Sequence, residues 1–233
     1  MTVTAERSSY QYTDLPRLMQ LMTGDEKHGP SATSTLDVLW VLYDQVLRVA
    51  PEAVDEPERD RFLLSKGHGP MAYYAVLAAK GFVPVAWLSG FGSFESRLGQ
   101  HPDRMLVPGV EIGSGSLGHG LPIAVGTALG LRAQGLVEPA VWTLVGDAEL
   151  DEGSNHEAIA FAGAVGIERL HAVVADNLSA TYGRAGGIAA RFDVAGWSTV
   201  SVDGRDHAAL YEAFTAPHPG RPRAVVARVE PKF

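Results

Sequence analysis

The sequence predicts an open α/β domain in which a mostly parallel sheet carries helices on both faces. Two apolar runs, 140–145 and 170–175, have the composition of buried strands, and the segment 155–165 between them has the spacing of a helix. A strand–helix–strand unit of this length joins two parallel strands by a right-handed crossover. Segments near 198–202 and 223–228 are predicted to be further strands of the same sheet, each preceded by a helix.

The first sixty residues are expected to contain one buried helix. Residues 1–12 are polar and are expected to be disordered. The apolar segment 34–43 predicts a helix that Ser34 can cap, with Asp37 in the first turn, where a carboxylate favours the helix dipole. The acidic segment 50–60 contains two prolines and is expected to form a surface loop.

A long glycine-rich loop separates the next two predicted helices. One helix should begin after Gly69 and another should span 117–134, with the loop at about 89–116 between them. Loops of this length inside one domain are uncommon and are often functional. Since no linker rich in Gly, Ser or Pro divides the chain, we expect residues 1–233 to form one domain.

Composition narrows the classes of partner. The chain has 233 residues, of which 46% are hydrophobic and 20% charged, and its formal net charge of −8 argues against nucleic acid or an anionic membrane as the main partner. The absence of cysteine excludes disulfides and thiolate metal sites, and it fits a cytoplasmic protein. The polar start lacks the apolar core of a signal peptide, and the most apolar stretch, 117–131, is too interrupted to span a membrane.

Polar side chains follow both strands of the central unit. Asp147 comes directly after the first strand segment and Asn177 follows the second, and this fold brings both strand ends to one edge of the sheet. A carboxylate, an amide oxygen and a nearby carbonyl suit Mg²⁺, and a helix that begins near Ser154 points its N-terminus at the same place, which favours an anion. Taken alone, each of these short sequences is more often a plain turn than a metal site.

A longer run of motifs points to one family. The segment Gly146 to Gly153, with Asn177 thirty residues after Asp147, resembles the thiamine diphosphate motif of transketolases. Other segments resemble further motifs of that family and occur in the family's order: Lys27-His28-Gly29-Pro30, Leu64-Ser65-Lys66-Gly67-His68-Gly69, Gln100-His101-Pro102-Asp103, Pro108-Gly109-Val110-Glu111 and Gly113 to Gly120. Several motifs in order are far more specific than any one of them. The chain therefore resembles the N-terminal, thiamine diphosphate-binding subunit of a split transketolase.

The resemblance implies a metal and diphosphate site. Asp147, Asn177 and the backbone carbonyl of Ser179 would hold Mg²⁺, or Ca²⁺ or Mn²⁺ in its place. The metal would bind the diphosphate of the cofactor, thiamine diphosphate. His68 and backbone N–H groups near Ala148 would contact the same diphosphate.

The resemblance also implies contacts to the cofactor rings and to the substrate. The Gly115 carbonyl would accept a hydrogen bond from the aminopyrimidine, and Leu117 would pack against the rings. His28, His68 and His101 would line the channel to the reacting carbon and donate hydrogen bonds to substrate oxygens. The other implied site residues are Ser116, Gly146 and Glu149, which would contact the cofactor, and Glu152, which would join a carboxylate network at the subunit interface.

Three departures from the family's pattern suggest a specialised relative. Ala148 stands where the family has glycine, and alanine would add about 1 kcal/mol of strain if that position needs a positive φ or room for the diphosphate. We therefore expect weakened cofactor binding rather than none. His119 replaces a glutamine, and the chain after Arg223 lacks a histidine that larger members use near the diphosphate.

The resemblance leaves one essential group unassigned. In this family a glutamate on a second, pyrimidine-binding domain activates the cofactor. The chain ends at Phe233, just after the last predicted strand, so we expect a separate C-terminal subunit with that domain and an α₂β₂ heterotetramer. The leading hypothesis is ketol transfer from a ketose donor to an aldehyde. The alternatives are a subunit of another thiamine diphosphate enzyme, such as a carboligase or 2-oxo acid decarboxylase, and a degenerate, non-catalytic scaffold subunit.

Overall fold

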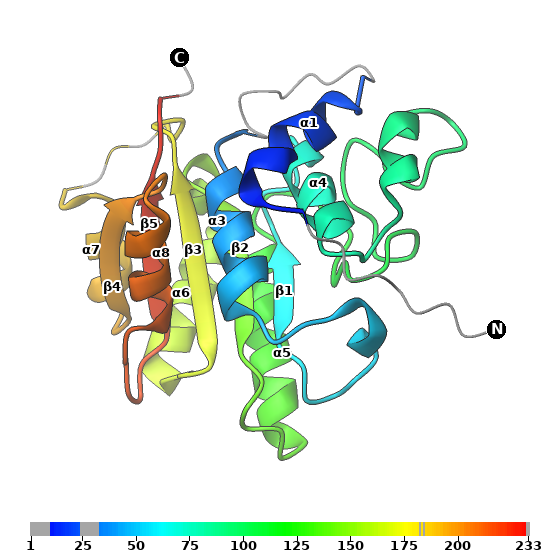
Figure 1. Ribbon diagram of the computed structural model, residues 1–233. Helices are drawn as coiled ribbons and strands as arrows, with labels where there is room; N and C mark the ends of the chain where they lie inside the picture. Colours follow the sequence, from blue (N-terminus) through cyan, green and yellow to red (C-terminus); the bar gives the residue numbers. More distant parts are fainter. Residues whose placement is uncertain (1–9, 24–32, 182, 184, 232–233) are drawn as a thin grey trace.

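The predicted strands pair with one another and with one further strand that the sequence did not predict. A computed structural model describes residues 10–23, 33–181, 183 and 185–231. Its sheet has the strand order β1-β2-β3-β5-β4 (Figure 1). The strands are β1 Arg61–Leu64, β2 Val141–Gly146, β3 Leu170–Asp176, β4 Ser198–Asp203 and β5 Arg223–Arg228. All neighbours are parallel, so the carboxyl ends of β1, β2 and β3 lie side by side at one edge.

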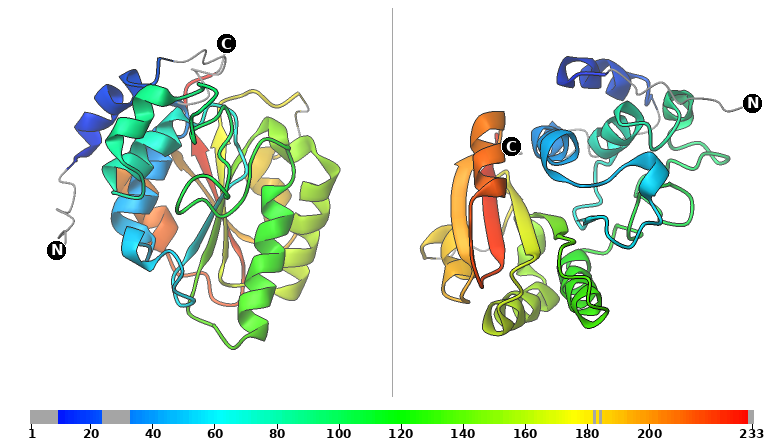
Figure 2. Two further views of the ribbon diagram at one scale, coloured as in Figure 1. Left: turned by 90° about the vertical axis from the view of Figure 1, so that its right-hand side faces the viewer. Right: turned by 60° about the horizontal axis from the view of Figure 1, so that its bottom comes forward.

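Helices cover both faces of the sheet, which confirms the predicted fold class (Figure 2). One face carries α5 Gly120–Ala133, α6 Gly153–Val165 and α7 Gly187–Asp193. The other carries α1 Leu15–Gln20, α3 Leu36–Val41, α4 Met71–Ala79 and α8 His207–Thr215. No helix in the described part of the chain combines the length and apolar character that a membrane span requires.

Short helical turns occupy several connections. They are η1 Tyr12–Asp14, η2 Leu42–Val46, η3 Pro51–Ala53, η4 Val85–Gly90 and η5 Ala148–Asp151. Of these, η5 lies directly after β2 and leads into α6, so it occupies the edge where the sequence predicts a metal site.

Two helices begin at residues other than those predicted from the sequence. The N-cap of α3 is Thr35 rather than Ser34, and its side chain makes no capping hydrogen bond. Helix α5 begins at Gly120 rather than at 117, because Gly118 has a φ of +84°, a left-handed conformation that an α-helix cannot contain. The loop before α5 therefore extends three residues further than expected.

Asp37 lies in the first turn of α3, as predicted, but it does more than favour the helix dipole. The carboxylate is buried and accepts hydrogen bonds from the hydroxyl of Tyr12 and from Arg205, and Nε2 of His207 lies 2.9 Å from it. This cluster fixes Tyr12, within the stretch expected to be disordered. Residues 1–9 of that stretch lie outside the described residues.

Helix α6 packs closely against the turn before β4. A Cβ atom at Gly163 would overlap the carbonyl oxygen of Ala195 and lie 3.2 Å from the ring of Trp197. Trp197 is fully buried, and its indole N–H donates to the carbonyl of Ile159 at 2.9 Å. The close approach of the two backbones therefore requires glycine at this position.

We predict that Gly163→Ala lowers the melting temperature by about 4–8 °C, because overpacking costs ~2 kcal/mol in a chain of this size. Gly126→Ala on α5 is the matched control, since a Cβ there would meet no atom within 4 Å. The control should melt at the wild-type temperature or slightly above it. Equal melting temperatures for Gly163→Ala and the wild type would contradict the packing argument.

His171 on β3 is buried near the amino ends of the strands. Its ring stacks on Trp142 with centroids 3.9 Å apart, and the ring of His218 meets it edge-on at 4.9 Å. Burial lowers the pKa of His171 well below its usual value of 6.5, and the nearby charges of His218, Arg169 and Arg223 lower it further. The folded protein therefore holds this imidazole in its neutral form.

A pH dependence of stability follows. Because the unfolded chain takes up this proton near pH 6.5 and the folded chain does not, the free energy of unfolding should fall below that pH by up to ~1.4 kcal/mol per unit. His171→Phe keeps the stacked ring and should remove this part of the fall between about pH 6.5 and 5. His119→Gln, at an exposed position, should retain it. Urea unfolding at each pH checks this, and identical slopes for His171→Phe and the wild type would refute it.

Candidate active site at the carboxyl edge of the sheet

The Asp147 carboxylate organises the turn that follows the neighbouring strand. It lies just past β2 and is 2% exposed. The backbone N–H of Ser179 donates to one oxygen at 2.6 Å and that of Ala180 at 3.1 Å, while the Ser179 hydroxyl donates to the other oxygen at 2.6 Å. The two strand ends that the sequence predicts at one edge are therefore joined directly.

The same turn contains a strained residue. Leu178 has a φ of +57°, the only positive φ of a non-glycine residue in the part of the chain that the structure describes. This conformation costs of order 1 kcal/mol for an L-residue. The bonds from Ser179 and Ala180 to Asp147 hold the turn in this conformation. Strain of this kind occurs preferentially at ligand sites.

The oxygen atoms at this edge fit a hard cation. A carboxylate offers about four acceptor positions, and Asp147 uses three of them, so one is left. Asn177 is 2% exposed, and its Oδ1 has no hydrogen-bond partner among the described residues. No group of three His, Cys, Asp or Glu suited to a metal occurs in the described ranges. The donor set fits Mg²⁺, which keeps water and takes further ligands from a phosphate.

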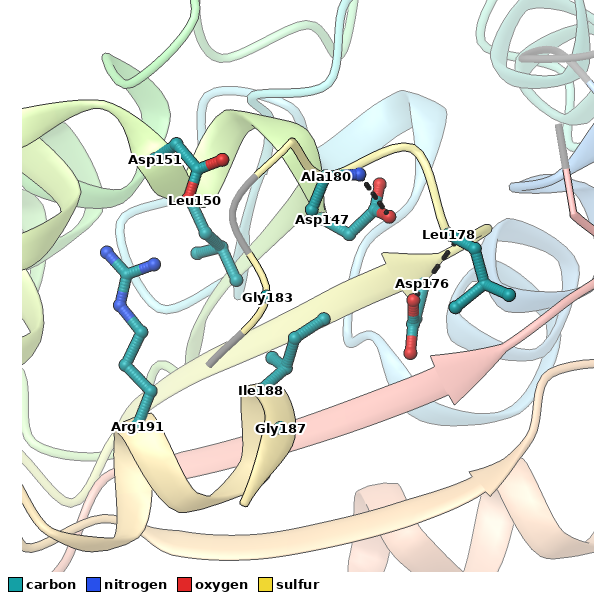
Figure 3. Close-up of a pocket in the computed structure, with 10 residues that line it drawn as sticks. All are labelled: Asp147, Leu150, Asp151, Asp176, Leu178, Ala180, Gly183, Gly187, Ile188 and Arg191. Carbon is teal, nitrogen blue, oxygen red and sulfur yellow. Dashed lines mark hydrogen bonds between the residues drawn. The ribbon is translucent and has the colours of Figure 1, made fainter. Parts of the chain in front are cut away.

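A cavity of about 380 Å³ opens beside Asp147, between η5 and α7 (Figure 3). Carboxylates line it at Asp147, Asp151 and Asp176, and Arg191 reaches toward it from α7. Its apolar wall includes Ile188. Sequence reasoning missed Arg191 and Ile188, because α7 was predicted only as an unnamed helix between two strands.

Three of the predicted residues meet at the neighbouring strand end. His68 lies in the segment after β1, and its ring meets that of His101 edge-on with centroids 4.9 Å apart. Gly115 has a φ of +120°, and a Cβ there would lie 3.0 Å from the ring of His101. The segment after β1 and the long loop before α5, which are far apart in sequence, therefore converge here. His28 lies outside the described residues.

The other predicted residues surround this point. Leu117 is 38% exposed, and Ser116 Oγ lies 3.4 Å from Nε2 of His119. Glu152 is exposed at the N-cap of α6. Ala148 begins η5 without a positive φ, so the condition for backbone strain at that position is not met.

Glu149 is buried between the two halves of the site. Its carboxylate accepts from the hydroxyl of Ser65, from the N–H of Gly118 at 2.9 Å and from the N–H of Gly146 at 3.1 Å. Burial raises the pKa of Glu149, while these hydrogen bonds and the charge of Lys66 act in the opposite direction. Ser65 was not predicted to be a site residue, although it lies inside the segment 64–69, which resembles a motif of the family.

Residues 19–229 match the family described as "Transketolase, thiamine diphosphate binding domain". The chain belongs to this family. The match runs from α1 to just beyond β5, and it confirms the expectation that the sequence motifs raised. Among solved structures, the transketolase from Leishmania mexicana is similar with a TM-score of 0.77 and 26% identity, over 94% of this chain and 36% of that one. This transketolase-family domain therefore corresponds to about a third of that enzyme.

Two similar proteins are named as subunits of transketolases. One, from Actinobacillus succinogenes, is a subunit of an apulose-4-phosphate transketolase and is 43% identical over 131 residues, which is 56% of this chain and 47% of that protein. The other, from a Clostridium species, is a subunit of a 6-deoxy-6-sulfo-D-fructose transketolase and is 38% identical over 143 residues, 61% of this chain and 52% of that protein. The matched part thus spans about half the length of these two relatives.

A third relative is named as a ferredoxin rather than as a transketolase. "Ferredoxin fas2" from Rhodococcoides fascians is 54% identical over 224 residues, which cover 96% of this transketolase-family chain and 74% of that protein. Iron–sulfur clusters are held by cysteine thiolates, and this chain contains no cysteine. The likeness to that relative therefore gives this chain no ligand for such a cluster.

We predict that Asp147→Ala speeds amide hydrogen exchange of Ser179 and Ala180 at least about 10-fold, because hydrogen bonds to a charged group contribute ~1.5–3 kcal/mol. Asp147→Asn is the matched control. Its amide oxygen can still accept from both N–H groups, and the Ser179 hydroxyl can turn to accept from its NH₂, so exchange should stay within about 3-fold of the wild type. Equal exchange in Asp147→Ala and the wild type would show that the carboxylate does not hold the turn.

Proposed function

We propose that this chain is the N-terminal subunit of a transketolase-like enzyme, which transfers a two-carbon ketol unit from a ketose donor to an aldehyde. The observation that carries the proposal is the buried oxygen pair of Asp147 and Asn177 at the same sheet edge as the His68–His101 pair. A cation site and a pair of histidines in a thiamine diphosphate-binding domain suit a diphosphate cofactor and a hydroxylated substrate. The names of the two transketolase relatives support the same reaction class.

The residues of this chain would bind the cofactor and orient the substrate. Asp147, Asn177 and the Ser179 carbonyl would hold Mg²⁺ on the diphosphate. When bound, thiamine diphosphate supplies the carbon nucleophile of the reaction. His68 and His101 would donate hydrogen bonds to donor-sugar oxygens and stabilise negative charge that develops there. The His101 ring packs against Gly115 and meets the ring of His68, which would restrict water at that point.

The proposal includes a partner subunit. It would carry the pyrimidine-binding domain with the activating glutamate, and two copies of each chain would form a heterotetramer. The exposed carboxylate of Glu152 is available for a contact with another chain. The cysteine-free composition supports a cytoplasmic location.

The second candidate function is 2-oxo acid decarboxylation with acyl or acyloin transfer, which uses the same cofactor. By analogy with the transketolase family, the histidine pair favours sugar hydroxyls, and therefore ketol transfer, over 2-oxo acids. Backbone strain at Ala148 would have supported the hypothesis of a non-catalytic scaffold subunit, but Ala148 has no positive φ.

Cofactor binding tests the first part of the proposal. Calorimetry on the chain with its partner should detect thiamine diphosphate binding that requires Mg²⁺. Asp147→Asn, which preserves the turn, should weaken it about 100-fold or more, equal to ~2.8 kcal/mol. Glu168→Gln, at an exposed position outside the site, should bind as the wild type does. Undiminished binding by Asp147→Asn would remove the metal assignment, and no binding by the wild-type complex would favour a scaffold.

Activity tests the second part. The two-subunit complex should transfer a ketol unit from phosphorylated ketoses to an aldehyde, and this chain alone should not, because the activating glutamate is assigned to the partner. Consumption of pyruvate without ketol transfer would establish the second candidate instead. Full ketol transfer by this chain alone would refute the split architecture.

A further inference from the structure

Glu149 connects the two segments that the proposed function assigns to opposite ends of the cofactor. The 146–151 segment, which contains Asp147, would take the metal and the diphosphate. The 113–120 segment, which contains Gly115, would take the aminopyrimidine. We propose that Glu149 is a positioning residue, whose carboxylate fixes the distance between these two segments without touching the cofactor. The inference rests on the proposed function, since that function gives the segments their ligands.

Three hydrogen bonds engage both oxygens of the Glu149 carboxylate. Oε1 accepts from the N–H of Gly118 at 2.9 Å and from the hydroxyl of Ser65, and Oε2 accepts from the N–H of Gly146 at 3.1 Å. The residue is 1% exposed. All three hydrogen-bond partners are donors from three separate segments, and the charge of Lys66 also acts on the carboxylate. The side chain therefore acts through the backbone of its neighbours rather than on a ligand.

The donor set also requires a carboxylate. A glutamine at position 149 has one acceptor oxygen and one NH₂ group. In either orientation its NH₂ would face an N–H, of Gly146 or of Gly118, and that pair of donors cannot bond. The Ser65 oxygen already accepts from the N–H of Gly120 at 2.9 Å, so accepting from a glutamine NH₂ as well would use both of its lone pairs and leave its proton without the carboxylate acceptor.

Neighbouring contacts make the connection rigid. The amide of Asn155 donates to the carbonyl of Glu149 at 2.7 Å, and the hydroxyl of Ser154 donates to the carbonyl of Gly118 at 2.7 Å. A Cβ at Gly120 would overlap Ser65, and one at Gly118 would lie 2.7 Å from the Cβ of Glu152. The 113–120 segment therefore packs directly on the start of α6 and on the end of β1, with no space for a shift.

The test separates the two ends of the cofactor. Affinity is measured by calorimetry for thiamine diphosphate and for inorganic diphosphate, each with Mg²⁺, on the full chain with its partner subunit. Glu149→Gln should weaken thiamine diphosphate about 10-fold or more, the range seen when groups that orient a site are removed, and should change inorganic diphosphate by less than about 3-fold. Glu157→Gln, an exposed position on α6, is the matched control and should change neither.

Ser65→Ala provides a second variant in case Glu149→Gln folds poorly. It removes one donor to the same carboxylate, so it should weaken thiamine diphosphate selectively as well. The double variant should lose less affinity than the product of the two single losses, because both act through one network.

Three outcomes would overturn the positioning role. They are unchanged thiamine diphosphate affinity in Glu149→Gln, an equal loss for both ligands, and independent effects of the two substitutions. A different result would remove the proposed function instead: a wild-type complex that binds neither ligand, or that does not prefer thiamine diphosphate to inorganic diphosphate. The two failures are therefore distinguishable.

Discussion

The parallel pairing of β1, β2 and β3 determines where every residue of the site lies. β1 has only four residues, yet its register with β2 places the segment that contains Ser65 and His68 beside the one that contains Asp147. The register of β2 with β3 brings Asn177 to the same edge. Because parallel strands need long crossover connections, these neighbours in space are distant in sequence. The candidate site therefore requires β1, β2 and β3 to be paired with one another.

Two buried carboxylates hold this edge together, and both use neutral donors. Asp147 accepts from Ser179 and Ala180, and Glu149 accepts from backbone N–H groups of two glycines and from Ser65. Glycine allows the backbone to approach a carboxylate closely, since no side chain intervenes. Neutral donors orient the Asp147 carboxylate without cancelling its charge, which suits the proposed divalent cation, whereas the charge of Lys66 also acts on Glu149.

The sequence predicted the parts of the fold that have long, apolar signals. β2, β3 and β5 are continuous buried runs, and the polar residues just past β2 and β3 identified the shared edge. β1 was missed, because four residues after an acidic loop carry little periodic signal. The hydrogen bond between Ser65 and Glu149 joins residues 84 positions apart, and no local sequence pattern predicts a contact over that separation. Ala148 has no positive φ, because helical geometry begins directly after Asp147, and the positive φ occurs at Leu178, which the sequence did not indicate.

The 84-residue separation of Ser65 and Glu149 also bears on how the chain folds. Closing a loop of that length costs roughly 4 kcal/mol of chain entropy before any contact compensates. Local helices can form without that cost. This edge, in contrast, requires β1 to pair with β2, and α4, the long loop and α5 lie between the two strands in the sequence. We therefore expect this edge of the sheet to form late in folding. A partly folded chain would lack it, so a ligand bound there would distinguish fully folded molecules from incomplete ones.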